Sequence, residues 1–305
     1  PAQFCNLSEV VVRADDTMED LARKTELATI LGTMQSTLTD FKGLRGRWKQ
    51  NTEEERLLGV SMTGIMDSVL TNGSEDGLED RLRELRAITV KVNKKWAKKF
   101  EIQESKAITC VKPSGTVSQL TDAASGIHAR HNPYYIRTVR GDNKDPLTEF
   151  MIGKGIPAEA DVMKPDHTTV FSFPMKSPDG AVCRTDVTAI EHLELWKSYQ
   201  LAWCHHKPSI TISVKEHEWM EVGAWVYENF DFMSGVSFLP YSEHSYQQAP
   251  YQDCTQEEYE SLLETMPKDI DWAELAELEM EDNTTGTQEL ACTGGACELT
   301  DIGGS

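Results

Sequence analysis

The sequence lacks a long apolar run and is short of basic residues, and each absence excludes a class of protein. Its 305 residues contain no run of eighteen apolar residues, so no membrane-spanning helix is expected. A secretory signal is missing too. Only 30 Lys and Arg stand against 50 Asp and Glu, a net charge of −20. Because neutralising phosphates takes a surplus of basic side chains, this balance excludes a partner that is a nucleic-acid polymer.

Cysteine is scarce as well, with seven residues in the whole chain. An odd number spread this thinly does not make a disulfide scaffold, so the sequence indicates a reducing, cytoplasmic location in which any disulfide is catalytic. His205 and His206 are adjacent rather than at ligand spacing, and no second close pair accompanies them. We therefore predict no metal site.

What the chain does contain is enough apolar surface for a core. Hydrophobic residues make up 39% of the sequence, which excludes a disordered chain. A globule of 34.2 kDa buries about three quarters of its unfolded surface, as one large domain or two ordinary ones. The sequence opens at Pro1, rather than Met, in a strand-like run, which suggests a segment of a longer protein.

Strand-like runs alternate with helical periods over most of the chain, a pattern typical of parallel α/β architecture, either barrel or open sheet. The residues Asp15-Asp16-Thr17 supply N-cap chemistry for the first helix. Apolar spacing predicts that the residues of this helix that point inward are Met18, Leu21, Ala28, Leu31, Met34 and Leu38. Strands are expected at 4–12, 57–62, 107–111, 134–139, 168–173, 210–214 and 233–239, and further helices at 78–100, 146–152, 187–203 and 216–230.

The composition changes near residue 253. From there to residue 301 there are fifteen acidic residues and one basic residue, Lys268. Two short helices are expected, at 256–265 and 272–280, followed by a polar stretch that cannot bury enough surface to stay folded. The predicted organisation is an α/β body at 1–252, an acidic helical extension at 253–282 and a flexible tail at 283–305.

Two cysteines near the end of that tail, Cys292 and Cys297, enclose Thr-Gly-Gly-Ala. Glycines reach backbone angles that let such a pair close a small disulfide, so the spacing favours redox use by thiol exchange. The alternatives are two incidental surface thiols, or half of a zinc site that lacks its other ligands.

The residues Lys112-Pro113-Ser114-Gly115-Thr116-Val117-Ser118 join a predicted strand to a predicted helix. Backbone N–H groups and hydroxyls at such a junction can bind an anion. The segment lacks the Gly-Lys-Ser/Thr ending of a Walker motif, and by itself it is more often a simple helix cap. A lone cysteine on a strand, such as Cys5, is by default a small buried hydrophobe.

Several stretches together resemble the C-terminal part of the monomeric, adenosylcobalamin-dependent (class II) ribonucleoside-triphosphate reductases. They include Phe-Cys-Asn-Leu-Ser-Glu-Val-Val at 4–11, Leu-Leu-Gly-Val-Ser-Met-Thr-Gly at 57–64, residues 110–120, Ala-Ser-Gly-Ile-His at 124–128, Tyr-Tyr-Ile-Arg at 134–137, Val-Lys-Glu-His-Glu-Trp at 214–219 and the terminal cysteine motif. The resemblance implies the second half of a ten-stranded α/β barrel. It also implies adenosylcobalamin (coenzyme B12) as cofactor, and thiyl-radical reduction of ribonucleoside triphosphates to deoxyribonucleotides for DNA synthesis.

The same resemblance implies roles for single residues. Cys5 matches one of two wall thiols that form a disulfide in each turnover. Ser114, Gly115, Thr116, Val117 and Ser118 match the loop that holds substrate phosphates. Cys292 and Cys297 match a shuttle pair that reduces the wall disulfide and is itself reduced by thioredoxin or a glutaredoxin-type protein. No residue can be named for the cofactor.

The chain also departs from the family. The radical cysteine of these reductases lies in an Asn-x-Cys-x-Glu motif shortly before the position of Cys5, and this motif is absent, as are the second wall cysteine and the first barrel half. Alone, the chain is expected to be inactive and to need the missing N-terminal half as its partner. A second hypothesis remains, a free-standing α/β phosphate-binding module whose tail cysteines serve redox sensing or metal binding.

Overall fold

The computed structural model describes residues 2–241, 247–279, 292–293 and 296–297. Contacts divide the chain into two units, the first made of Pro1–Arg130 and Pro178–Tyr241, the second of His131–Ser177 and Ser242–Ser305. The division at residues 252 and 282, which follows charge rather than contacts, stays a prediction. Among the described residues no helix is long and apolar enough to cross a membrane.

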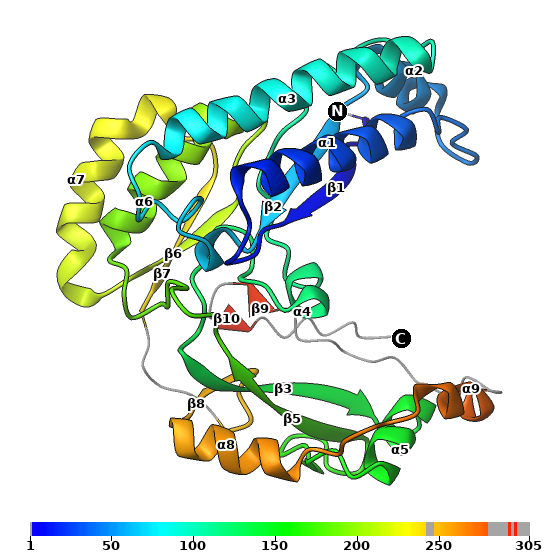
Figure 1. Ribbon diagram of the computed structural model, residues 1–305, viewed down its shortest axis with the longest axis vertical. Coiled ribbons are helices and arrows are strands. Elements are labelled where there is room, and N and C mark those ends of the chain that lie inside the picture. Colours follow the sequence, from blue (N-terminus) through cyan, green and yellow to red (C-terminus); the bar gives the residue numbers. More distant parts are fainter. Residues whose placement is uncertain (1, 242–246, 280–291, 294–295, 298–305) are drawn as a thin grey trace. The chain divides into compact units, whose positions relative to one another are not determined.

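Parallel strands form the sheet of the first unit (Figure 1). β1 (Asn6–Val11) pairs with β2 (Leu58–Thr63), and β6 (Ile210–Val214) pairs with β7 (Val236–Pro240). Residues 106–111 lie between the two pairs, since parallel bridges join Val60 to Thr109 and Val111 to Pro208. The order is therefore β1, β2, residues 106–111, β6, β7, and the parallel arrangement predicted from the sequence is confirmed in this unit.

Helices make the crossovers between these strands. α1 (Met18–Gln35) and α2 (Gly46–Glu55) follow β1, α3 (Leu78–Lys99) follows β2, and α6 (Ala189–Ser198), extended by a π-helical turn at Tyr199–Trp203, leads to β6. α7 (Trp219–Asn229), between the short helices η3 (Glu216–Glu218) and η4 (Phe230–Phe232), joins β6 to β7. The core between helices and strands includes Leu58, Met62, Leu82, Leu85, Trp196 and Trp203.

The expectation about α1 was partly wrong. Thr17 does cap the helix, in a capping box with Asp20, and Leu21 and Ala28 are buried. Leu31, Met34 and Leu38, however, are 52%, 49% and 72% exposed. The buried face consists of small residues instead, Thr25, Ala28, Thr29, Gly32 and Thr33, which let the helix approach β1 and β2 closely. Spacing of large apolar residues misses a face of this kind.

The sheet of the second unit is antiparallel, which corrects the expectation of parallel strands throughout. Its order is β4 (Ala158–Ala160), β5 (Thr168–Lys176), β3 (Tyr134–Asp142) and β8 (Tyr251–Asp253). β3 pairs with β5 over nine residues, and α5 (Pro146–Gly153) lies in the connection between them. Alternating strands and helices do not fix strand direction, because direction depends on which strands pair in the folded chain.

The acidic segment forms the expected helix α8 (Gln256–Thr265), and then η5 (Trp272–Glu274) and α9 (Leu275–Leu278). The ring of Tyr259 lies 5.1 Å from that of Tyr134 on β3, and the ring of Trp272 lies 5.4 Å from that of Phe150 on α5. These helices therefore pack on the second unit. The predicted flexible tail lies outside the described residues, apart from β9 (Cys292–Thr293) and β10 (Ala296–Cys297).

Candidate functional site

One face of the first unit's sheet carries two thiols that flank a glycine. Alternate residues of a strand share a face, so Cys5, Leu7 and Glu9 point to the same side of β1. Gly59 of β2 is the register partner of Leu7. A Cβ atom placed on Gly59 would lie 2.9 Å from the Cys5 Sγ and 3.4 Å from the Cys110 Sγ. The Leu7 Cδ2 atom would lie closer still, so the two sulfur atoms and the Leu7 side chain pack together over Gly59, where a side chain would not fit.

The two thiols differ in exposure and acidity. Cys5 is half-buried, whereas Cys110 is 1% exposed. Burial raises the pKa of both thiols, that of Cys110 to about 12, and the ammonium group of Lys112 opposes this rise at both sites. A thiolate is the nucleophile in thiol exchange, and access governs its rate. Cys5 is therefore the thiol of this pair that is suited to redox chemistry.

The segment that the sequence predicts as an anion site is a loop of residues 112–126, called here the PSGT loop. Its first hydroxyl, that of Ser114, donates a short hydrogen bond to Glu9 Oε1. The hydroxyl of Ser61 on β2 donates to the same oxygen at 2.9 Å, and itself accepts a hydrogen bond from the Lys112 N–H at 2.9 Å. Glu9 therefore connects the start of the PSGT loop with β1 and β2, on the face that carries Cys5.

The other predicted residues of the PSGT loop are less constrained. Gly115 and Thr116 are exposed, and Thr116 precedes the short helix α4 (Val117–Thr121) without a hydrogen bond from its side chain to the helix start. Val117 is 37% exposed, while Ser118 is buried and its N–H donates to the Ser114 carbonyl at 2.9 Å. The hydroxyl of Thr116 is thus not used as a helix cap, which was the alternative interpretation of this motif.

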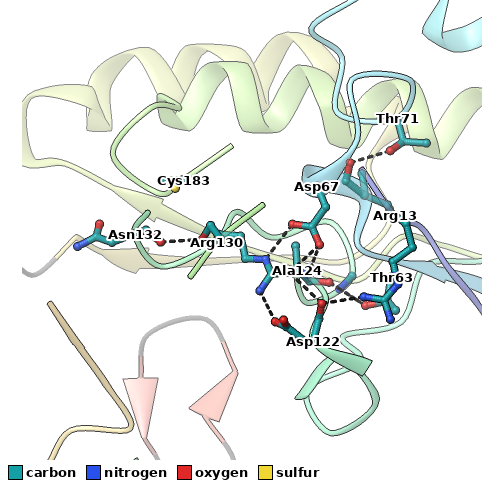
Figure 2. Close-up of polar contacts among 12 residues, drawn as sticks. Arg13, Thr63, Asp67, Thr71, Asp122, Ala124, Arg130, Asn132 and Cys183 are labelled. Carbon is teal, nitrogen blue, oxygen red and sulfur yellow. Dashed lines mark hydrogen bonds and ion pairs between the residues drawn. The ribbon is translucent and has the colours of Figure 1, made fainter. Parts of the chain in front are cut away.

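The far end of the PSGT loop is held by a buried ion pair (Figure 2). Arg130 donates from Nε and Nη2 to the two carboxylate oxygens of Asp67 at 2.8 and 2.9 Å, and the two side chains are 3% and 2% exposed. Arg130 Nη1 also donates to Asp122 at 2.8 Å, and Asp67 accepts the Ala124 N–H at 2.8 Å. The ion pair therefore fixes the loop at two positions, Asp122 and Ala124.

The neck of the loop is closed by a glycine. Gly126 has a φ of +57°, and a Cβ atom there would lie 2.5 Å from the Lys112 carbonyl oxygen, a contact that requires glycine. Thr63 Oγ1 accepts the Gly126 N–H at 2.9 Å and donates to the Ala124 carbonyl at 2.9 Å. The loop therefore returns to its starting point.

Two histidines lie next to the neck and are held in neutral form, His128 just after it in the chain and His192 on α6. His128 Nδ1 lies 3.0 Å from the Ser125 carbonyl oxygen, and its Nε2 accepts the Thr211 N–H at 3.0 Å, which places the ring proton on Nδ1. His192 Nε2 donates to the Ile127 carbonyl at 2.9 Å. Burial lowers the pKa of both rings, that of His192 to about 4. These histidines are structural rather than ligands.

The predicted shuttle cysteines lie in the second unit. The backbones of β9 and β10 pair antiparallel, with Cys292 directly opposite Cys297. Residues directly opposite in such a pair have Cα atoms about 4.5–5.5 Å apart, within the range that a disulfide spans. The local backbone thus suits the redox use predicted from the spacing.

An acidic pocket of about 670 Å³ also lies in the first unit, near the start of α3. Its lining includes the carboxylates of Glu75, Asp76, Glu79, Asp80, Asp186 and Glu191 and the guanidinium of Arg83. Because the carboxylates outnumber the one cation, this pocket disfavours an anion, and the PSGT loop remains the candidate for one.

Sequence analysis missed Glu9, Ser61 and Cys110 as parts of this site. Alternate residues of a strand share a face, so the sequence could have placed the Glu9 carboxylate, four residues after Cys5, on the same face as that thiol. Ser61 and Cys110 gave none, because their relation to Cys5 and Ser114 depends on which strands are neighbours in the sheet.

Similar proteins were found by sequence, although no family model matches the chain. A protein of Euglena gracilis named adenosylcobalamin-dependent ribonucleoside-triphosphate reductase is 29% identical over 274 residues, which cover 88% of this chain and 36% of that protein. A protein of the same name from Lactobacillus leichmannii is 28% identical over 81% of this chain and 37% of its own length. A Dictyostelium discoideum protein described as a probable member is 26% identical over 97% of this chain and 38% of its own length.

A solved structure is similar as well. The crystal structure of a B12-dependent (class II) ribonucleotide reductase superimposes with a TM-score of 0.77 at 24% identity, and the match covers 91% of this chain and 41% of that one. The chain therefore has the α/β fold of part of that reductase. It spans just over a third of the length of the curated relatives that it matches.

Proposed function

We propose that this chain is part of an adenosylcobalamin-dependent ribonucleotide reductase, an oxidoreductase that converts ribonucleoside triphosphates to 2′-deoxyribonucleoside triphosphates. The observation that carries the proposal is that a reducing thiol, Cys5, and the predicted phosphate-binding PSGT loop meet on one face of the sheet of the first unit. Glu9 and Ser114, 105 residues apart, are joined by a hydrogen bond that connects the PSGT loop to the strand of Cys5. The similarity to reductases named for this activity supports the same conclusion.

Cys5 supplies one of the two reducing thiols. Loss of the 2′-hydroxyl as water needs two electrons, and oxidation of two thiols to a disulfide provides them with two protons, so the reaction balances as ribonucleotide plus dithiol to deoxyribonucleotide plus disulfide plus water. Half-burial keeps Cys5 reachable by a substrate. Its disulfide partner belongs to the portion of the reductase that precedes this chain in the family.

The PSGT loop holds the triphosphate through the hydroxyls of Ser114 and Thr116 and the free space at Gly115. The exposure of Gly115 and Thr116 supports this role. Val117 and Ser118 shape the loop, since Ser118 is buried and bonded back to Ser114.

Cys292 and Cys297 act as a shuttle that reduces the Cys5 disulfide by thiol exchange and passes its own oxidation to a thioredoxin or glutaredoxin-type protein. Their opposed backbone positions support a disulfide between them. The cytoplasmic location belongs to the same proposal, supported by the free thiols of Cys5, Cys110, Cys204 and Cys254.

Adenosylcobalamin, when bound, supplies the radical that starts the reaction. His128 and His205 use both ring nitrogens in hydrogen bonds within the chain, and His192 and His206 each use Nε2, so the hydrogen bonds of these rings do not favour a cobalt ligand. We assign no described residue to the cofactor. The share of this chain in the reaction is therefore thiol and phosphate chemistry.

The finer organisation is part of the proposal too. Residues 1–252 would contribute the second half of a ten-stranded barrel, residues 253–282 an acidic helical extension, and residues 283–305 the redox tail. The five parallel strand segments of the first unit support the barrel half.

The test is reconstitution. The chain is combined with the N-terminal portion of a relative, adenosylcobalamin, a ribonucleoside triphosphate and dithiothreitol, and deoxynucleotide is measured by chromatography. We expect product, its loss in Cys5→Ser, and its retention in Cys110→Ser, which removes the neighbouring buried thiol. An absence of product with every chain would favour the free-standing phosphate-binding module.

The shuttle has its own test in the same assay. Replacing Cys292 and Cys297 by Ser should abolish turnover with thioredoxin and spare turnover with dithiothreitol, which reaches the wall disulfide directly. Equal loss with both reductants would contradict the shuttle role.

A further inference from the structure

Glu9 occupies a position that the proposed function does not explain. It is half-buried, and its Oε1 accepts hydrogen bonds from both Ser61 and Ser114. Ser114 is the first hydroxyl that the PSGT loop would offer to a phosphate. In this structure that hydroxyl is directed at a carboxylate, which carries the same sign of charge as a phosphate.

A carboxylate and a phosphate cannot both use this hydroxyl without opposing each other. Each is an anion that accepts hydrogen bonds, and like charges at such distances repel strongly where water is partly excluded. The Ser114 hydroxyl has one proton to donate. A ligand phosphate must therefore take it from Glu9.

The residue that donates to Glu9 has a strained backbone conformation. Ser114 has a φ of +54°, in the left-handed region that costs a residue with a side chain about 1 kcal/mol or more. Gly115 next to it is exposed and has nothing within 4 Å of a Cβ position, so the tip has room to move. The Glu9 bond is thus made by a strained residue that is followed by an unconstrained one.

We propose that Glu9 is a positioning residue that competes with an anionic ligand for the Ser114 hydroxyl, so that the PSGT loop binds a phosphate chain only when Glu9 releases this hydroxyl or takes up a proton. The inference rests on the proposed phosphate role of the loop. It adds a determinant of affinity and of pH dependence to that role.

The groups around Glu9 allow proton uptake. The titratable groups on the same face are Cys5 on the strand of Glu9, and Cys110 and Lys112 on the neighbouring segment, while β2 and the loop contribute only the hydroxyls of Ser61 and Ser114. Burial raises the pKa of Glu9, and the two hydroxyl donors oppose this rise. Protonation of Glu9 would remove the charge that opposes a phosphate.

The experiment measures binding of inorganic tripolyphosphate to the 305-residue chain by calorimetry from pH 8 to pH 5. Glu9→Gln keeps the shape and the acceptor oxygen but removes the charge. We expect it to tighten binding about tenfold at pH 8, and the difference from the unaltered chain to shrink as the pH falls. The ratio between the two chains cancels titration of the ligand itself.

Two further variants complete the design. Glu84→Gln removes an exposed carboxylate on α3 and should leave affinity unchanged, which separates a local effect from the net charge. Ser114→Ala should weaken binding and make it insensitive to Glu9→Gln in the double variant. Circular dichroism of each chain checks that it is folded.

The outcomes separate the inference from the proposed function. If Ser114→Ala weakens binding but Glu9→Gln weakens it or leaves it unchanged at all pH values, the loop binds phosphate and the role of Glu9 is wrong. If Glu9→Gln binds and the unaltered chain does not, the inference is supported in its strongest form. If neither chain binds tripolyphosphate, both are overturned.

Discussion

The two ends of the PSGT loop are held by different kinds of contact. At its far end, Arg130 and Asp67 form a buried, two-bond ion pair, 3% and 2% exposed. At its start, a half-buried carboxylate, Glu9, holds one hydroxyl of the loop and one of β2. The first arrangement cannot open without leaving a buried charge unpaired, whereas the second can exchange its partner. One end is thus a permanent anchor and the other a replaceable contact.

The largest expected effect comes from breaking the permanent anchor. Asp67→Asn leaves the Arg130 guanidinium buried without its main charge partner, and should lower the free energy of unfolding by about 3–5 kcal/mol in a urea titration. Asp122 is the other partner of the same arginine, and the Asp122 side chain is 59% exposed. Asp122→Asn should therefore lower the free energy of unfolding by about 1 kcal/mol or less. Equal losses in the two variants would contradict the distinction.

Acid should weaken the same end of the loop. The folded-state pKa of His192 is lowered from 6.5 to about 4 by burial, so the unfolded chain binds more protons between these values. The contribution of His192 to stability is therefore complete above pH 6.5 and is lost as the pH falls toward 4, by about 3 kcal/mol. Urea titrations at pH 7, 5.5 and 4.5 of the unaltered chain and of His192→Gln measure this. If the free energy of unfolding depends on pH equally in the two chains, the ring does not titrate as described.

A smaller effect is expected when alanine replaces Gly126 at the neck of the loop, and almost none when it replaces Gly115 at the tip. Gly126→Ala forces a Cβ atom to within 2.5 Å of a backbone oxygen at a positive φ, and should destabilise the protein by about 2 kcal/mol. Gly115→Ala meets nothing within 4 Å and should change stability by about 0.5 kcal/mol or less. Thermal melts of the two variants are sufficient. A comparable loss at Gly115 would mean that the tip is as constrained as the neck.

The smallest effect has the opposite sign. Because the folded-state pKa of Glu9 is raised, its favourable contribution exists at low pH and is lost as the pH rises through that value. At pH 7 the ionised carboxylate lowers stability, so Glu9→Gln should stabilise the chain slightly, by about 1 kcal/mol or less. At pH 4 the gain should disappear. Destabilisation at pH 7 would show that the contact with Ser114 needs the charge.

Much of this architecture could be predicted from the sequence. Capping chemistry and an apolar period located α1, and an apolar period located α3, because these signals are local. Strand direction in the second unit and the small-residue face of α1 could not be predicted, since both depend on which segments are neighbours in the folded chain.

The candidate site divides in the same way. Ser114 to Ser118 stood out as a dense run of hydroxyls next to glycine, and Cys292 and Cys297 by their spacing. Cys5 was identified through resemblance to a family. Its surroundings are Gly59 on β2 and Cys110 and Lys112 on the next segment, and they were visible only in the structure.

The most direct test of the central claim is to find which cysteine is oxidised during turnover. The reconstituted enzyme, with Cys292 and Cys297 replaced by Ser so that the tail cannot reduce the Cys5 disulfide again, is given ribonucleoside triphosphate but no reductant, then quenched in acid, alkylated and examined by mass spectrometry. The account predicts that Cys5 loses its free thiol in proportion to the deoxynucleotide formed, while Cys110 and Cys204 keep theirs. Formation of deoxynucleotide with Cys5 still fully alkylated would contradict it.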